Sequence, residues 1–477
     1  MTRYVKKHSA LLIGILILGF ILRFHALNAA ELSLDECLTR TISHFTDTNL
    51  LINSESPYGY VELSSLPVHY LINQAWQTTM GRGDFEVRML TVMAGCASLL
   101  LIYLISRKLF NEKTGLLASA IAALSSELIK YSRTGGNYSL FLLFSLLSIY
   151  FFIKIFFIKK FSKRDYAFYC LFTAVMLGCH YFGALLIFAQ GVFVLIHRFK
   201  EKWIWLLCQG GVTALLSYWP VTVIPRKIQN HAAVLYSVMW ISKPTLGSLV
   251  GTASRLFTGS SRYPLSPLEG IIISVLIVVM VFALIKSGHA KSHFFSISML
   301  AIWGVPLTAS LIIPNFSIYH DRFFILLFPW VYISIASLLS SKRWIVIISL
   351  LILGSLNLTN ALPLYQEHRP YTEIIEKAID TDINAQLILY PPYYSCYTRW
   401  YFPSYHQFGR QYMNLEQTAK LISNHSDTWY IFTSIKEPGR IQGVDENLLN
   451  ALVPKNYSFY LVNGTEFTTI RIFNKSN

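Results

Sequence analysis

The first 362 residues alternate long apolar runs with short polar turns, and this pattern predicts a bundle of transmembrane helices. A helix that crosses the hydrocarbon core of a bilayer needs about 20 mostly apolar residues. About eleven segments approach that length and composition. The predicted spans are residues 10–27, 88–106, 115–131, 138–157, 166–180, 182–197, 203–224, 268–286, 294–313, 322–339 and 344–362.

The remainder of the chain, 363–477, mixes polar and apolar positions and predicts a separate domain. Helix-like spacing alternates there with strand-like runs, and Asn463-Gly464 between two of these runs is a strong hairpin signal. We therefore expect a transmembrane domain at 1–362, with a long first outer loop at 28–87, and a small extramembrane α/β domain at 363–477. The strand-like runs are 386–390, 429–433, 459–462 and 467–473.

Composition excludes most other classes of protein. Apolar residues make up 53% of the 477 residues and charged residues only 14%, with a mean hydropathy of +0.45. Disordered chains need low hydrophobicity and high charge, and small disulfide scaffolds are short and rich in Cys, whereas this chain has six. What remains is an α-helical polytopic membrane protein.

The net charge of +15 indicates how the chain crosses the membrane. If the N-terminus is cytoplasmic, the segments on that side hold 18 Lys and Arg residues and three acidic residues. Cytoplasmic loops are enriched in Lys and Arg, so we expect a cytoplasmic N-terminus and, with an odd number of spans, an external C-terminal domain. The positive charge is then a topology signal, and no nucleic-acid partner is needed to explain it. A second outer piece, 225–267, carries five basic residues and no acidic residue.

The first outer loop holds two short helical patterns. Ser33 and Glu36 have capping-box spacing, which places Asp35 and Glu36 in the first turn of a helix, where the dipole favours negative charge. Capping alone accounts for Glu36, whereas a cap does not require Asp35, so Asp35 is the stronger candidate for chemistry. A second helix is expected to begin at Pro67. Its apolar stripe would be Val68, Leu71, Ile72, Ala75 and Trp76.

A series of short motifs, in a fixed order on the predicted outer side, carries a resemblance to a known family. The chain resembles the GT-C glycosyltransferases that use polyprenyl-phosphate sugars, in their protein-mannosyltransferase and aminoarabinose-transferase-like branch, over roughly 10–340. One departure is Ser64-Ser65-Leu66 before Pro67, where family members usually have Lys-Pro-Pro or His-Pro-Pro. The motifs are Arg23, Asp35-Glu36, Pro67 to Trp76, Arg88, 102–117, Tyr131-Ser132-Arg133, Tyr138, His180-Tyr181-Phe182 and Asp321-Arg322-Phe323.

The resemblance implies transfer of one sugar, with inversion, from a polyprenyl phosphate to a lipid, glycan or protein acceptor. The base would be Asp35, with Glu36 as helper or cap, because a single displacement needs one essential carboxylate. Arginine binds phosphate through its planar fork; the simpler alternative is that basic residues at helix ends extend to lipid head groups. The candidates for the donor phosphate are Arg88, Arg133 and Arg322, and the supporting residues are Arg23, Tyr131, Tyr138 and His69.

Several alternatives stay open at this point. Arg23 is expected to pair with Asp35 or Glu36. No metal ligand set is predicted, although Glu62 with His69 leaves a divalent ion as an alternative. A lipid or oligosaccharide transporter, or a non-catalytic subunit of a cell-envelope glycan assembly complex, would also be multi-span. The resemblance favours a bacterial inner membrane. The implied partners are a polyprenyl-phosphate-linked sugar donor, its acceptor and membrane lipids.

Overall fold

The computed structural model separates the chain into two compact units, each described by itself below. The first, called the helical unit, comprises Met1–Ala29, Leu51–Ser54 and Glu62–Glu367, and the second, called the mixed unit, comprises Ala30–Leu50, Glu55–Val61 and His368–Asn477. The structure describes residues 2–44, 67–158, 161–218, 221, 225, 241–260, 267–286, 289–314, 316–340, 343–366, 386–389, 429–437, 440–441, 457–462 and 467–474.

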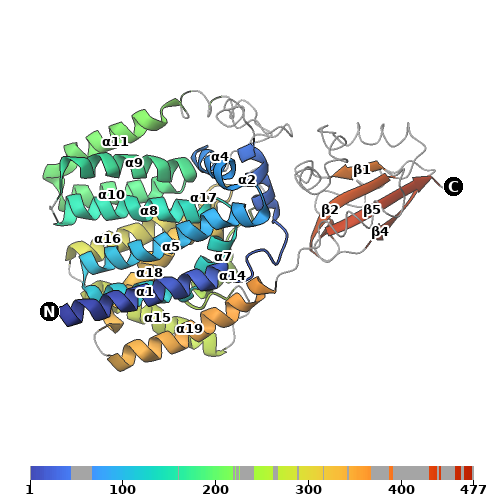
Figure 1. Cartoon of the computed structure of the whole chain (residues 1–477). Helices are drawn as coiled ribbons and strands as arrows, with labels where there is room; N and C mark the ends of the chain where they lie inside the picture. Colours follow the sequence, from blue (N-terminus) through green and yellow to red (C-terminus); the bar gives the residue numbers. More distant parts are fainter. Residues whose placement is uncertain are drawn as a thin grey trace. The chain divides into compact units, whose positions relative to one another are not determined.

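The helical unit is a bundle in which the long helices run side by side (Figure 1). Two of its helices continue into π-helical turns, at Ile153–Ile158 and Leu300–Gly304, and a 3-10 segment, η5, covers Asp321–Leu326. The α-helices are α1 (Thr2–Phe24), α4 (Val68–Met80), α5 (Asp84–Leu109), α6 (Glu112–Leu124), α7 (Ser126–Arg133), α8 (Tyr138–Phe152), α9 (Lys163–Cys179), α10 (Gly183–His197), α11 (Lys202–Leu216), α14 (Leu246–Thr258), α15 (Pro267–Lys286), α16 (His289–Met299), α17 (Val305–Ile312), α18 (Leu327–Leu339) and α19 (Arg343–Tyr365).

Each of the predicted spans coincides with helical structure, which agrees with the predicted membrane bundle. Within the described residues, five helical stretches are long and apolar enough to cross a membrane. Because the other spans are shorter or incompletely described, the count of about eleven stays a prediction. The five stretches are Asp84–Leu109, Tyr138–Ile158, Ala290–Ile312, Asp321–Leu339 and Val346–Tyr365.

Contacts at the helix ends support the predicted alternation of the spans. Three polar contacts link residues that lie in predicted cytoplasmic segments or at the helix ends next to them. Which face of the membrane is cytoplasmic stays a prediction, since this pairing is the same for either orientation. The contacts are His8 with Glu112 at 3.3 Å, Lys154 with Asp165 at 2.6 Å, and His197 with His293 at 2.7 Å.

The bundle is held together by apolar packing in which aromatic side chains are prominent. Trp330 on α18 is 1% exposed and packs its ring against Phe294 and Phe295, with centroids 5.2 and 4.9 Å apart. Phe294 also stacks on Phe152 at 5.2 Å, which ties α16 to α8. Such rings each bury a large apolar area, so the scaffold that carries the outer ends is rigid.

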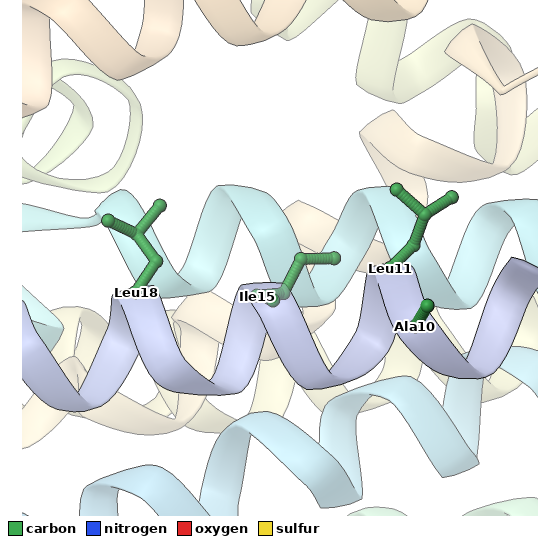
Figure 2. A pocket seen from close by; sticks show the side chains of 5 residues that line it. Ala10, Leu11, Ile15 and Leu18 are labelled. Atoms are coloured by element: carbon green, nitrogen blue, oxygen red, sulfur yellow. The ribbon is translucent and has the colours of Figure 1, made fainter.

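The outward-facing side of α1 is apolar, as expected for a helix in contact with lipid. Figure 2 shows Leu11, Ile15 and Leu18 along one side of the helix, where with Ala10 and Gly14 they line a shallow hollow of about 430 Å³. No titratable side chain lines this hollow.

The mixed unit contains helix α2 (Leu34–His44) and a five-stranded sheet. Strand β1 pairs parallel with β2, and the β2–β5 and β5–β4 pairs are antiparallel. The predicted hairpin is confirmed by the β4–β5 pairing, although its Asn463-Gly464 turn lies outside the described residues, as do the predicted helices of the tail. The strands are β1 (Gln386–Leu389), β2 (Trp429–Glu437), β3 (Arg440–Ile441), β4 (Tyr457–Val462) and β5 (Phe467–Asn474).

Candidate functional site

The short helix α7 carries or contacts most of the predicted site residues in the helical unit. The predicted span 115–131 is broken at Ser125, whose extended backbone ends α6 and whose hydroxyl accepts from the Leu128 N–H at 3.4 Å to cap α7. The side chains of α7 contact α1, α8, α14 and α19.

Arg23, in the last turn of α1, is buried against α7 and α6. Its Nε donates to Ser132 Oγ at 3.1 Å. Gly95 leaves the room for this contact, because a Cβ at that position would lie 2.1 Å from Ser132 Oγ. The guanidinium also donates to the backbone oxygens of Gly19 (3.0 Å), Ala123 (3.2 Å) and Ala122 (3.3 Å).

The expected pairing of Arg23 with Asp35 or Glu36, which belong to the mixed unit, stays a prediction. Within the described part of the helical unit, the groups that accept from its guanidinium are neutral oxygens. These contacts are favourable because carbonyls near a helix end lack intrahelical partners and accept strongly from a cation. Arg23 therefore stabilises the packing of α1 on α6 and α7.

Arg133, at the end of α7, binds the backbone that follows α1. Its guanidinium donates to the carbonyl oxygens of Ala26 at 2.8 Å and Arg23 at 3.2 Å, and also to that of His25. The same guanidinium lies 4.7 Å from the centre of the Tyr365 ring. Arg133 thus caps the C-terminal end of α1, a position that favours a cation.

Arg88, in the first turn of α5, acts on the same stretch of backbone. It is 3% exposed and donates to the carbonyl oxygen of Leu27 at 2.8 Å. Ala26, between the anchored residues, has a left-handed φ of 50°, a conformation that a non-glycine residue holds only when its surroundings fix it. Two of the three predicted phosphate arginines therefore position the residues from which the first outer loop departs.

The third arginine, Arg322, belongs to a different cluster, around His180. Phe323, directly after Arg322, packs on His180 with ring centroids 5.3 Å apart, and Val68, directly before His69, contacts Gly178, two residues before His180. The Tyr131 and Tyr138 rings pack with centroids 5.2 Å apart, and the Tyr138 ring lies 5.8 Å from the imidazole of His180. The structure thus gathers four predicted residues, Arg322, Tyr131, Tyr138 and His69, about one histidine.

His180 follows α9 and is enclosed by aromatic rings. Phe141, Phe182 and Phe323 lie 5.1–5.4 Å from its ring centre. Its Nδ1 accepts from the Phe182 N–H at 3.2 Å. An imidazole nitrogen that accepts a hydrogen bond carries no proton, so the ring is neutral and carries its proton on Nε2, where it is a hydrogen-bond donor.

An ion network on the far side of α7 was not predicted as part of the site. Arg255 on α14 lies 2.9 Å from a carboxylate oxygen of Asp321 and 3.4 Å from one of Glu127. Asp321 also accepts from the Thr252 hydroxyl at 2.7 Å. Because Asp321 directly precedes Arg322 and Glu127 is one turn before Tyr131, this network positions two members of the cluster. The sequence does contain a signal for this network. Glu127 and Asp321 are acidic residues at predicted outer helix ends, and the predicted outer segment 225–267, which contains Arg255, has basic residues and no acidic residue.

Helix α4 rests on the outer end of α9, beside His180. A Cβ at Gly178 would lie 2.3 Å from Val68 Cγ2, so a glycine is what allows the two helices to approach. At the other end of α4, Trp76 Nε1 donates to the Glu86 carbonyl oxygen at 2.7 Å. His69, in the first turn of α4, is 2% exposed. These contacts fix α4 along the edge of the cluster.

The local structure of α2 separates the roles of Asp35 and Glu36. The Ser33 N–H donates to Glu36 Oε2 at 2.8 Å, and Glu36 is 1% exposed, as a capping residue would be. Asp35, in the same first turn, is exposed. Because α2 belongs to the mixed unit, its geometry is described within that unit alone.

The described residues contain no group of three or more His, Cys, Asp or Glu side chains that would hold a metal ion. Glu62, the expected partner of His69, lies outside the described residues. The alternative of a divalent ion at this pair therefore stays open.

Comparison with known proteins bears on both fold and activity. Residues 65–224 match the family model described as dolichyl-phosphate-mannose-protein mannosyltransferase. No curated protein sequence matches the chain. The matched range includes α4, Arg88, all of α7 and His180.

Solved structures match over almost the whole chain. ArnT from Cupriavidus metallidurans bound to undecaprenyl phosphate is 12% identical, with a TM-score of 0.61 over 99% of this chain and 98% of that one. The Archaeoglobus fulgidus oligosaccharyltransferase tethered to an acceptor peptide is 10% identical, with a TM-score of 0.50 over 96% and 73%. The mycobacterial arabinofuranosyltransferase AftD is 11% identical, with a TM-score of 0.53 over 98% and 40%.

These matches confirm the predicted fold class, a GT-C-like polytopic membrane protein. The family model and the named neighbours are all glycosyltransferases, so the predicted resemblance and the predicted class of enzyme are confirmed as well. The matches do not identify the substrates, the catalytic residues or the orientation in the membrane.

Proposed function

We propose that this chain, as a GT-C glycosyltransferase, moves a sugar from a polyprenyl-phosphate donor to an acceptor on the outer face of a bacterial inner membrane. The observation that carries the proposal is the cluster around His180, in which a neutral imidazole and two tyrosines from the family-matched range gather at the helix ends with Arg322. Undecaprenyl phosphate bound to the structural neighbour ArnT supports the class of donor.

In the proposed reaction, an acceptor oxygen forms a bond to C1 of the sugar while the bond from C1 to the phosphate oxygen breaks. Asp35 takes the acceptor proton, and the polyprenyl phosphate leaves as an anion. A positioned general base contributes about 10²–10⁴-fold in rate. The exposure of Asp35 at the start of α2, with Glu36 engaged as the cap, supports this division of roles.

Stabilisation of the leaving phosphate is assigned to Arg322 and to the Nε2 proton of His180. Donors placed where negative charge develops are among the largest contributions to catalysis in sites that exclude water. Because Nδ1 of His180 accepts from the Phe182 N–H, the ring proton is on Nε2, from which it can be donated. Arg88 and Arg133 contribute by fixing the start of the loop that carries Asp35.

Polar groups inside the spans favour this enzyme over the transporter alternative. The Tyr169 hydroxyl donates to Gln190 Oε1 at 2.7 Å and accepts from Gln209 Nε2 at 3.1 Å, while the Ser148 and Thr173 hydroxyls lie 2.8 Å apart. Mutually paired polar groups of this kind hold membrane helices together. They are engaged with one another and do not line a polar path.

An in vitro transfer assay tests the proposal. Purified protein would be given a panel of undecaprenyl-phosphate sugars with candidate lipid, glycan and protein acceptors, and products would be identified by mass spectrometry. The proposal predicts a product that gains one sugar together with release of undecaprenyl phosphate. Hydrolysis without transfer, or no turnover of any donor across the panel, would contradict it.

A further inference from the structure

Helix α4 buries a polar stripe. His69, Asn73 and Gln77 are spaced by four residues and therefore share one face. They are 2%, 0% and 3% exposed, respectively. The predicted apolar stripe is less buried: Val68, Leu71, Ile72 and Trp76 are half-buried and Ala75 is exposed.

The amide groups of this stripe are not fully paired. Asn73 Nδ2 donates to the His69 carbonyl oxygen at 2.8 Å, but no group of the described chain pairs with Asn73 Oδ1 or with either amide atom of Gln77. A buried polar atom without a partner is costly, and native proteins keep few of them. Three such atoms on one helix face indicate that a ligand completes their hydrogen bonds.

The position of the stripe indicates which part of a ligand it meets. Its N-terminal end is beside the cluster around His180, because Val68, directly before His69, packs on Gly178, two residues before His180. Eight residues of α-helix at 1.5 Å each carry it about 12 Å from His69 to Gln77. A ligand whose phosphate lies near Arg322 and His180 would place its next chemical group along this stripe.

The chemistry of the stripe suits hydroxyl groups. Each hydroxyl both donates and accepts, and an amide offers an N–H₂ donor and a carbonyl acceptor side by side. We propose that Asn73 and Gln77 bind hydroxyl groups of the sugar carried by the polyprenyl-phosphate donor, and so determine which sugar the protein accepts. This inference rests on the proposed function and adds specificity residues to it.

The principle behind the expected selectivity is that a site built to bind a hydroxyl rejects a ligand that lacks it. The unpaired amides would then remain unsatisfied in the complex, as they are in the free protein. Sugar binding should therefore show up as a gain in affinity over the bare lipid phosphate, and this gain is the quantity to measure.

The experiment compares affinities for undecaprenyl phosphate and for its glucose, mannose, galactose and arabinose esters. Wild-type protein is expected to bind at least one ester about tenfold or more tightly than undecaprenyl phosphate. Gln77→Met and Asn73→Leu should reduce this gain to about twofold or less, with the affinity for undecaprenyl phosphate unchanged. Thr78→Val, a polar-to-apolar change at an exposed position on the opposite face of α4, is the matched control and should keep the full gain.

Stability of the unliganded protein separates ligand recognition from a structural role. Gln77→Met removes two unpaired amide atoms, so its melting temperature should equal or exceed that of wild type. A lower melting temperature, as expected if the amide were needed for folding, would count against the inference.

The possible failures are distinguishable. If both variants keep the full sugar-dependent gain, or if wild-type protein binds undecaprenyl phosphate but gains nothing from any sugar, the inference is overturned while the proposed donor class stands. If wild-type protein binds none of these lipids, the proposed function fails, and the inference fails with it.

Discussion

Arg255 Nε lies 2.9 Å from a carboxylate oxygen of Asp321, the residue directly before Arg322. Since Arg255 also reaches Glu127 on α7, one side chain from α14 links the two elements that carry Arg322 and Tyr131. A residue that contacts neither donor nor acceptor thereby controls the geometry of the proposed phosphate site.

Replacing Arg255 with Met is expected to leave two carboxylates without their shared cation. Hydrogen bonds to charged groups are worth about 1.5–3 kcal/mol, so the melting temperature should fall. The affinity for undecaprenyl phosphate should fall about tenfold, because Arg322 is no longer held in place. Arg255→Lys should recover part of the melting temperature and part of the affinity. Lys113→Met, at an exposed position, should change neither quantity. Unchanged donor affinity in Arg255→Met would show that the network is structural only.

The contact between Gly178 and Val68 predicts a second effect. A Cβ at residue 178 would overlap Val68 Cγ2, so Gly178→Ala should displace α4 from the edge of the site and lower the transfer rate. Val68→Ala removes the overlapping methyl and should restore part of the rate in the double variant. Gly210→Ala, where a Cβ meets nothing within 4 Å, is the control. Equal rates for wild type and Gly178→Ala would mean that the position of α4 does not matter.

The sequence predicts the fold well because membrane spans and tail strands depend on local patterns. The apolar runs locate the helices, and Asn463-Gly464 locates the β4–β5 hairpin. The break at Ser125 was not visible, since 115–131 is apolar enough to read as one span. The break at Ser125 separates α7 from α6. The helix that contacts most of the candidate site residues therefore could not be recognised from the hydrophobic pattern.

The candidate residues were found more readily than their contacts. The positions of Arg23 and Arg133 at helix ends could be read from the chain, but not that their guanidinium groups bind backbone carbonyls. Partners of this kind leave no sequence signal, because every residue has a carbonyl group. The burial of Asn73 and Gln77 was not predicted for a related reason: both are polar, and polarity alone indicates exposure.

The central claim, transfer from a polyprenyl phosphate with Asp35 as the base, is tested most directly by the transfer rate of Asp35→Asn. Asparagine keeps the size of the side chain but cannot take the acceptor proton. With the donor identified by the panel assay, the account predicts at least about a 10²-fold loss of transfer, with donor affinity unchanged and Glu36 still capping α2. Transfer at the wild-type rate by purified Asp35→Asn protein would contradict it.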